Sequence, residues 1–448
     1  MACAVLGAPP PVAAQAVNLG GTARENQVTS RDRPDFEPLG LDFGTILAPF
    51  LGGYTSQTLN AITVRPRFEV VQEFNDNIFN QADRGVGDKI VHFKPALSLG
   101  SDFENHAITA FFDADRGRYY ENRQENYTDY NVGTKTTIQV LDETSVTAGY
   151  TFSKKHEIGN APLDPAVAAR GGTAFGQIVT DRGVGITNFD QHLIELGAVL
   201  SQDPLILRVD TAARRSSYQP KLEIENEDRN IWQFQITPRI GYQFFEDTTF
   251  YIQPQYARRI YDAKFDRSGN NNNGREKQLL FGVTYDFSDL TFAEISGGVV
   301  HSQFDDRRFK PSTGFTFDAT LIWNSTDLST FTFRALRSNL ATTDTETKTV
   351  ATQHFSIGLD YEALDNLILT GVISYTNSEY LTDLPAFLNG VQLQNRTDDQ
   401  FQYQAGLRYL IGPNISATAN YTLLDRKANF RANKLTKNRW LFGLAAQL

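Results

Sequence analysis

Hydrophobic and polar residues alternate with a period of two along most of the chain. In one segment Trp232 and Phe234 fall on one face and Gln233 and Gln235 on the other, and the same pattern recurs in 401–409. A period of two places successive side chains on opposite faces of a β-strand. These segments therefore predict strands with one apolar face suited to lipid and one polar face suited to water.

Short and long connections separate the alternating segments in turn. The short connections are rich in Asp, Asn and Pro, which favour tight turns, and they fall at 101–105, 141–144, 202–204, 246–248, 288–289, 326–327, 364–366 and 412–414. The long connections are polar and fall near 75–88, 120–127, 157–187, 217–229, 262–275, 304–312, 338–350, 380–397 and 426–438. Roughly eight short turns and nine long loops, with both chain ends on the short-turn side, require about eighteen strands.

Strand length separates two all-β architectures. The alternating segments run for about 12–16 residues, whereas the strands of a soluble β-sandwich, the alternative, usually have about five or six. The sequence therefore predicts a single transmembrane antiparallel up-and-down β-barrel of about 18 strands, with short periplasmic turns and long extracellular loops. We expect the barrel to close because lipid offers no hydrogen bonds to an open sheet edge.

The last strand is expected to begin near Arg439. Trp440, Phe442 and Leu444 alternate there with less bulky residues up to the end of the sequence. This pattern is typical of the terminal strands that the barrel-assembly machinery recognises, so we expect that machinery to be a partner.

The first 61 residues lack the alternation. Residues 1–16 are interpreted as the remnant of a signal peptide, because they are apolar and end in Ala14-Gln15-Ala16 but lack a positively charged start. Residues 17–61 are interpreted as a periplasmic lead-in or plug, of which Leu39–Leu47 is apolar enough to dock at the barrel mouth, and residues 62–448 as the outer-membrane barrel. The longest loop, His156–Thr187, is a second candidate for narrowing the pore. An ordinary linker or surface loop is the alternative for each.

Composition narrows the class of protein further. The chain has 448 residues and a net charge of −10, with a mean hydropathy of −0.36. No run approaches the ~18 consecutive apolar residues of a membrane helix, which excludes a helical membrane protein. The acidic balance argues against nucleic acid as a partner. The single cysteine, Cys3, lies within the signal-like stretch, so no disulfide framework is expected and the composition suits an exported protein.

The alternation also predicts which charged residues line the interior. A Lys or Arg facing lipid at the bilayer midplane costs about 2–4 kcal/mol, so the charged face should be the inner one. The predicted pore-lining cations are Arg65, Arg67, Lys94, Lys135, Arg208, Arg214, Arg239, Arg259, Arg334 and Arg408. The predicted pore-lining anions are Glu69, Glu73, Asp113, Asp115, Glu195, Asp210, Asp286, Glu294, Asp318 and Asp360. This balance indicates weak ion selectivity or polar, sugar-like cargo; alternatively, the charges pair across strands and fill the interior.

Signatures of catalysis and metal binding are absent from the sequence. It contains no G-x-S-x-G, no H-E-x-x-H and no phosphate-binding loop. Its histidines, His92, His106, His156, His192, His301 and His354, are scattered, and we predict a solvated or rim position for them. We expect no catalytic residues, no metal and no cofactor.

Three short segments resemble the beta-barrel porin 2 family of bacterial outer membranes. They are Arg33–Leu41, the string Glu73-Phe74-Asn75-Asp76-Asn77-Ile78-Phe79, and Pro95–His106. The resemblance covers nearly the whole chain in architecture and its first quarter in motif. It implies a porin-like protein of the Gram-negative outer membrane, surrounded by lipid and lipopolysaccharide. Some relatives are associated with export of extracellular polysaccharide, which makes polysaccharide-export components candidate partners.

Three functions remain open from the sequence. The first is a polar, mixed-charge pore for passage or export of hydrophilic solutes, including exopolysaccharide. The second is a non-conducting structural or adhesive barrel with a filled interior. The third, an outer-membrane enzyme with active residues on its outer loops, is the least favoured, because no pair of nucleophile and base can be named.

Overall fold

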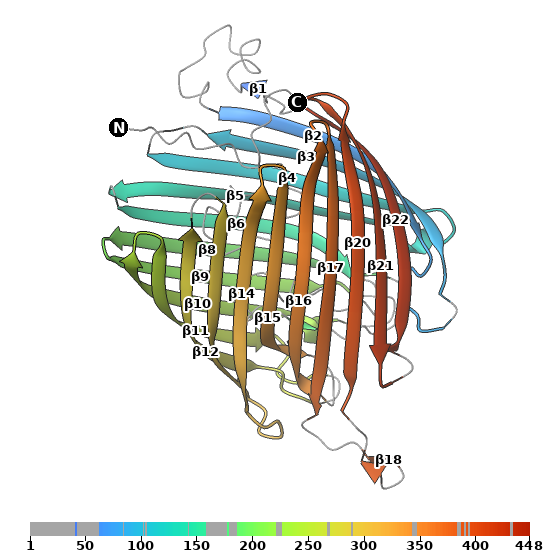
Figure 1. Cartoon of the computed structure of the whole chain (residues 1–448). Helices are drawn as coiled ribbons and strands as arrows, with labels where there is room; N and C mark the ends of the chain where they lie inside the picture. The colour runs from blue at the N-terminus through green and yellow to red at the C-terminus, as the bar shows by residue number, and fades with distance from the viewer. Residues whose placement is uncertain are drawn as a thin grey trace, which may run out of the picture.

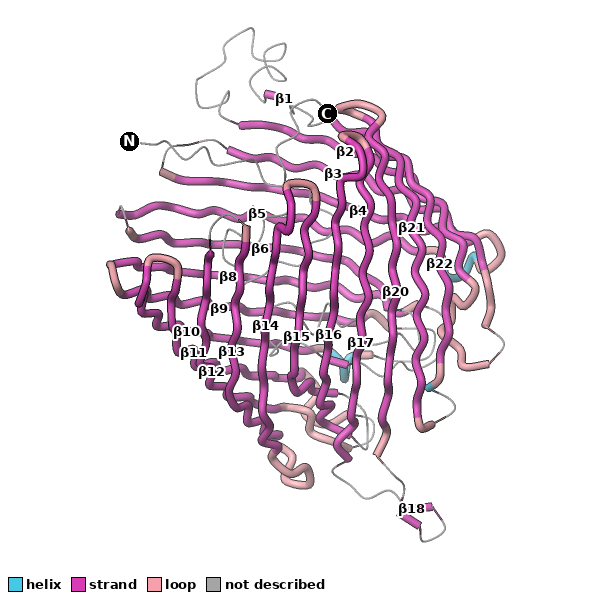
Figure 2. The backbone as a smooth tube through the Cα atoms, in the orientation of Figure 1, coloured by secondary structure: helices cyan, strands magenta, loops and turns pink. Residues whose placement is uncertain are grey.

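Long antiparallel strands make up almost all of the fold, as the ribbon in Figure 1 and the tube in Figure 2 show. The computed structural model describes residues 41–42, 62–83, 85–101, 103, 105–141, 143–157, 177–178, 186–220, 226–266, 269–287, 290–342, 347–382, 387–388, 391–392, 395–430 and 433–448. The helices in these ranges are the short 3-10 turns η1 (Arg123–Glu125) and η3 (Glu227–Arg229). No helix in this described part of the chain has the length and apolar character needed to cross a membrane.

The long strands have similar lengths of 13 to 18 residues. In the first half they are β2 (Ile62–Asn75), β3 (Asp88–Ser101), β4 (His106–Tyr119), β5 (Tyr127–Leu141), β6 (Thr144–Glu157), β8 (Thr187–Gln202), β9 (Leu205–Tyr218), β10 (Ile231–Phe245) and β11 (Thr248–Tyr261). In the second half they are β12 (Gly274–Phe287), β13 (Thr291–Phe304), β14 (Ser312–Thr326), β15 (Ser329–Thr342), β16 (Thr347–Leu364), β17 (Leu367–Thr382), β20 (Thr397–Leu410), β21 (Ile415–Ala428) and β22 (Leu435–Gln447). Two-residue strands complete the set: β1 (Leu41–Asp42), β7 (Gln177–Ile178), β18 (Phe387–Leu388) and β19 (Val391–Gln392).

Pairing between the first and last long strands closes the sheet into a barrel. Each long strand pairs with its neighbours in the chain, and β2 also pairs with β22, from Arg67 opposite Gln447 to Asn75 opposite Arg439. The closed sheet has 20 strands, of which β1 and β7 are the two-residue strands, so 18 long strands form the wall. This confirms the predicted barrel and its strand number, and the β-sandwich is excluded.

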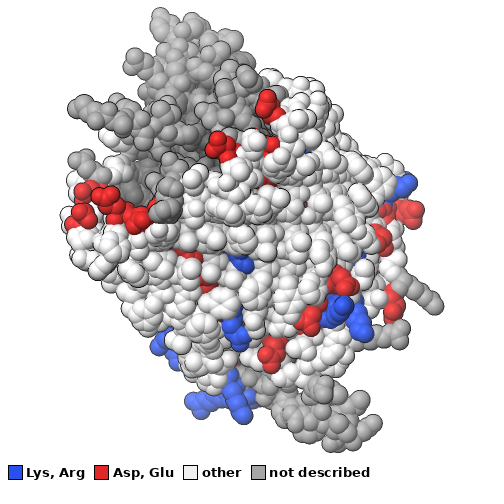
Figure 3. Space-filling view, in the orientation of Figure 1, with Lys and Arg blue, Asp and Glu red and all other residues white. Residues whose placement is uncertain are grey.

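The exposure of alternate side chains identifies the lipid-facing side of the wall. Phe234 and Ile236 on β10 are 41% and 43% exposed, whereas Gln233 between Trp232 and Phe234 is only 2% exposed. The same exposed apolar row continues around the barrel, for example at Phe281 and Ile295. The face seen in Figure 3 is mostly uncharged, and its charged side chains lie mainly towards the two ends of the strands. The exterior therefore suits a bilayer, and the polar side chains point inward.

The positions of the short turns and long loops agree with the prediction except at two long loops. The loops predicted at 338–350 and 426–438 are shorter, because β15 continues to Thr342, β16 begins at Thr347, β21 continues to Ala428 and β22 begins at Leu435. At these strand ends the outward row becomes polar, with Arg337 on β15, Asp425 on β21 and Asn438 on β22, so the apolar alternation stops before the backbone pairing does. The start of the last strand near Arg439 was therefore placed four residues too late.

Two short strands connect the less regular segments to the wall. In the predicted lead-in, Leu41 and Asp42 of β1 pair with Val64 and Thr63 on the edge of β2, at the short-turn end of the barrel. In the longest loop, β7 pairs in parallel with Ala341 and Thr342 at the long-loop end of β15. This loop connects the fifth and sixth long strands, whereas β15 is the thirteenth, so β7 lies against a distant part of the wall. The signal-like stretch and the rest of the lead-in and of this loop lie outside the described residues.

Candidate functional site: the polar inner wall

The residues predicted to line the pore all lie on long strands, in the phase opposite to the exposed apolar rows. They are spread over the whole height of the wall, from Arg65 near the short-turn end of β2 to Arg259 near the long-loop end of β11. Their accessibility changes along that height. Lys135, Asp360 and Arg408, which lie towards the short turns, are exposed. The structure thus places the predicted set on one continuous polar surface, and its role in conduction stays a prediction.

Several of the predicted charges form ion pairs with one another. Two pairs lie within a strand: Arg67 with Glu69 at 2.9 Å, and Arg208 with Asp210 at 2.6 Å. Two pairs join different strands and are Arg239 with Glu294 at 2.9 Å and Arg334 with Asp318 at 3.6 Å. Pairing lowers the net field along the wall while leaving a polar surface.

A buried hydrogen-bonded network crosses the seam where the barrel closes. Glu73 on β2 accepts from Nε and Nη2 of Arg439 on β22, at 2.9 and 2.7 Å, and from Nδ2 of Asn75 at 2.8 Å. His92 on β3 lies 3.3 Å from Glu73 through Nε2 and 3.1 Å from Asp115 on β4 through Nδ1. The network therefore ties the last strand to the first three.

Tyr127 and His156 extend this network to two further strands. The Tyr127 hydroxyl on β5 donates to Asp115 at 3.1 Å, and its ring stacks on that of His156 on β6, with 3.8 Å between ring centroids. His156 in turn lies 2.9 Å from Asp129. The prediction of a solvated or rim position is wrong for His92, which is buried between carboxylates, and for His354, which is buried beside Thr376. Sequence alone missed Arg439, since nothing local places it beside Glu73.

The inner wall near the long loops is covered, unlike the part near the short turns. Its inward side chains there are mostly amides and hydroxyls. Buried examples are Gln233, Gln235, Gln255, Gln278, Ser302, Thr316, Ser338, Thr352, Ser374, Thr376 and Gln400. Several of their polar atoms, including Ser338 Oγ and Thr352 Oγ1, have no hydrogen-bond partner within the part of the chain that the structure describes. The barrel thus combines an accessible charged half with a covered half dominated by neutral polar groups.

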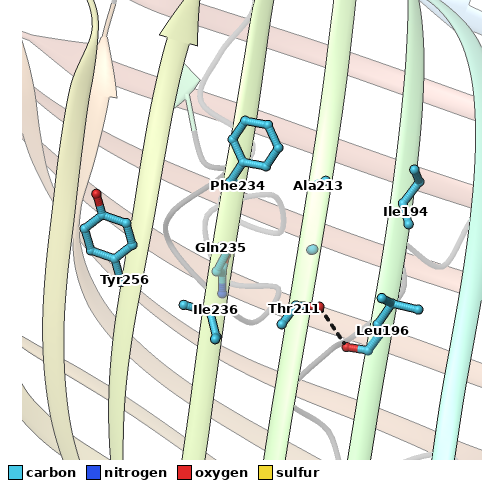
Figure 4. A pocket seen from close by; sticks show the side chains of 9 residues that line it. Ile194, Leu196, Thr211, Ala213, Phe234, Gln235, Ile236 and Tyr256 are labelled. Carbon is cyan, nitrogen blue, oxygen red and sulfur yellow. Dashed lines mark hydrogen bonds between the residues drawn. The ribbon is translucent and has the colours of Figure 1, made fainter.

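A groove of about 270 Å³ lies on the opposite side of the wall, over β8–β11. Figure 4 shows Ile194, Leu196, Phe234 and Ile236 around it, with the small residues Thr211 and Ala213 between them. Because these residues belong to the exposed apolar rows, the groove faces the lipid side and can accommodate an acyl chain. It does not belong to the polar interior.

The described ranges offer polar contacts but no cluster of metal-binding side chains. They contain no group of three or more His, Cys, Asp or Glu side chains placed to hold a metal ion. The charged interior offers binding and electrostatic steering of solutes.

Comparison with known proteins places these features in context. The model of the family described as "Putative beta-barrel porin 2" matches residues 61–448. No curated protein matches the chain. Among solved structures, the FrpB iron transporter from Neisseria meningitidis is similar, with a TM-score of 0.46 and 10% identity; the match covers 85% of this chain and 63% of that one. OpdK from Pseudomonas aeruginosa with vanillate and a BenF-like porin from Pseudomonas fluorescens Pf-5 each have a TM-score of 0.44 and 11% identity, covering 86% of this chain and 99% of theirs.

Proposed function

The chain belongs to the putative beta-barrel porin 2 family, and we propose that it forms a polar, mixed-charge pore for hydrophilic solutes in the Gram-negative outer membrane. One observation carries the proposal: a closed wall of 18 long strands has an apolar exterior and a charged interior that is accessible towards the short turns. Barrels of about 16–18 strands are wide enough to enclose an aqueous channel. The exterior is in contact with lipid and lipopolysaccharide, and the barrel-assembly machinery inserts it.

The accessible part of the interior suits polar cargo and selects only weakly by charge. Ion pairs such as Arg239 with Glu294 reduce the net field, so steering of simple ions is weak. Towards the short turns the accessible part of the wall also offers hydroxyl and amide groups, for example Thr370 and Gln404, which can exchange hydrogen bonds with hydroxyl-rich solutes. Exopolysaccharide in export is therefore a proposed cargo, with polysaccharide-export components as partners. The barrel acts as a conduit and carries out no covalent chemistry.

A second function, a non-conducting barrel with a filled interior, has its own support. Inward side chains such as Ser338 and Thr352 are fully buried. In addition, β7 in the longest loop pairs with the distant strand β15. Both observations favour a covered lumen at the long-loop end.

Planar-bilayer recording separates these two functions. The purified full-length chain is inserted into a bilayer and its current is recorded beside a variant lacking residues 17–61. Steady open-channel currents from the full chain support the pore and remove the filled barrel. Currents only from the shortened variant assign a plugging role to the lead-in. If neither protein conducts, the pore proposal is rejected.

A further inference from the structure

Arg259 differs from the other arginines of the inner wall. It lies near the long-loop end of β11 and is 2% exposed. Its Nε and Nη2 are buried and reach no hydrogen-bond acceptor among the described residues, and its guanidinium carbon lies 5.8 Å from the centroid of the Phe304 ring. No carboxylate in the described ranges forms an ion pair with it, whereas Arg67, Arg208, Arg239 and Arg334 each have one.

Two glutamine amides beside Arg259 also have donors without acceptors. Gln233 on β10 stands opposite Arg259 in the strand register, and its Oε1 accepts from Nε of Arg214 at 2.9 Å. That bond leaves Gln233 Nε2 as a buried donor with no acceptor in the described ranges. Gln255, on the same face of β11, has Nε2 in the same condition. Ala257 lies between Gln255 and Arg259, so only a methyl group separates the two polar side chains along the strand.

This donor cluster, Gln233, Gln255 and Arg259, has the wrong balance for a purely structural role. A buried cation without a counter-charge is unfavourable, and so is each buried donor left without an acceptor. The neighbouring arginine, Arg214, adds positive charge instead of neutralising it. The buried carboxylate of Glu276, opposite Ala257 on β12, accepts from Ser302 at 3.1 Å and forms no ion pair with Arg259 among the described residues. An oxyanion supplies both what the guanidinium lacks, a negative charge, and what the amides lack, lone pairs.

We propose that the donor cluster binds the oxyanion of a hydrophilic solute, a carboxylate, sulfate or phosphate, as the solute passes through the barrel. The site rests on the proposed pore function and names its substrate class. The guanidinium sits at the end of a flexible stem, which lets it reach towards the lumen. The planar fork of Arg259 pairs with two oxygens of the anion, and Gln233 and Gln255 donate to other oxygens or to hydroxyl groups of the same solute.

Block of the channel current by small solutes tests this site. Galacturonate, galactose and sulfate are titrated against the wild-type channel, Arg259→Gln and Arg258→Gln. Arg258 is the matched control, because it is the adjacent residue, carries the same charge and pairs with Asp305 on the outward side. We expect galacturonate and sulfate to block the wild-type current and galactose not to do so. Arg259→Gln should weaken both blocks by about 10-fold or more, as loss of a charge-assisted hydrogen bond implies, and Arg258→Gln by less than about 2-fold.

The pattern of block identifies the ligand class of the site or removes the site. Block by galacturonate alone assigns the site to sugar acids, and block by both anions assigns it to oxyanions in general. Equal block of wild type and Arg259→Gln, or equal block by galactose, overturns the proposal. If the wild-type chain does not conduct, the same solutes are titrated into the detergent-solubilised protein by calorimetry. If the wild-type protein binds the anions and Arg259→Gln does not, the anion site is supported and only the pore proposal is rejected. If the wild-type protein does not bind them, the site is rejected. Heat-modified gel migration verifies that each variant is folded.

Discussion

Replacing Glu73 by Gln should destabilise the barrel at its closing seam. Glu73 is 2% exposed and joins β2 to β22 through two hydrogen bonds from Arg439, at 2.9 and 2.7 Å. It also accepts from Asn75 and lies 3.3 Å from His92. Glutamine keeps the volume of the side chain but removes its charge. One of its two terminal groups then becomes a donor that faces the donors of Arg439.

The structure sets the expected magnitude of this loss. Breaking a buried ion pair by removing one partner costs about 3–5 kcal/mol when the other charge stays buried. The Arg439 side chain is 39% exposed, so water can partly replace the lost carboxylate. We therefore expect Glu73→Gln to lower the free energy of unfolding by about 2–3 kcal/mol.

Glu69→Gln is the matched control. Glu69 lies on the same strand and face, and its partner Arg67 is only two residues away on β2. Both side chains of this pair are partly exposed, at 18% and 19%, so its loss should cost about 0–1 kcal/mol.

Urea unfolding of the protein in lipid vesicles measures both values. Tryptophan fluorescence reports the transition, since Trp440 is adjacent to Arg439 in the chain. A double-mutant cycle with Arg439→Gln should give a coupling energy of at least about 1 kcal/mol. If the two glutamate variants lose equal stability, or if the coupling is below about 0.5 kcal/mol, the seam network does not stabilise the barrel and our reasoning is refuted.

Three further predictions use the same unfolding assay or amide exchange. A Cβ on Gly298 would lie far inside contact distance of the Leu279 carbonyl, so Gly298→Ala should cost about 1–3 kcal/mol of stability or prevent folding. The control Gly371→Ala, with nothing within 4 Å of the added Cβ, should change stability by less than about 0.5 kcal/mol. Equal effects would contradict the packing at Gly298. Leu321→Arg, on the lipid-facing side of β14, should lower the free energy of unfolding by about 2–4 kcal/mol. Thr320→Arg, on the inward face opposite Glu294, should lower it by less than about 1 kcal/mol. A larger loss for Thr320→Arg would show that the inward and lipid-facing sides are assigned the wrong way round. In the loop after β13, donation from Arg308 holds the pKa of Asp306 below its ordinary range, and Asp306 accepts from the Asn271 amide at 3.1 Å. The contribution of Asp306 to stability is present above its unfolded pKa of about 3.9 and is lost as pH falls through the lower folded pKa. Hydrogen exchange should therefore show the Asn271 amide equally protected at about pH 5 and pH 7, and Asp306→Asn should reduce that protection. Loss of protection by pH 5 would contradict this pairing.

The barrel itself could be predicted from the sequence because its signals are local. Alternation such as Trp232-Gln233-Phe234 fixes which side chains share a face, and turn residues such as Asp203 and Pro204 mark where the chain reverses. Lipid then imposes closure, so the strand number follows from counting turns. Where the outward row also becomes polar, as at Thr436 and Asn438 on β22, this signal fails and the strand end is misplaced.

The composition of the inner wall was harder to predict because it depends on contacts between distant segments. Glu73 and Arg439 are 366 residues apart, and only the register of the closing strands brings them together. His92 becomes buried through the registers of neighbouring hairpins, which place it on β3 between carboxylates from β2 and β4. Alternation placed Gln233 and Arg259 on the polar face but could not show that both are covered and that their donors lack acceptors.

Passage of a neutral sugar into proteoliposomes is the most direct test of a polar pore. The full-length chain is reconstituted into vesicles, which are transferred into isosmotic galactose while light scattering follows their volume. A polar pore predicts that vesicles with the protein swell and that protein-free vesicles do not. If vesicles with correctly folded barrels keep the volume of protein-free vesicles, the chain does not conduct hydrophilic solutes, and the filled barrel is the better description.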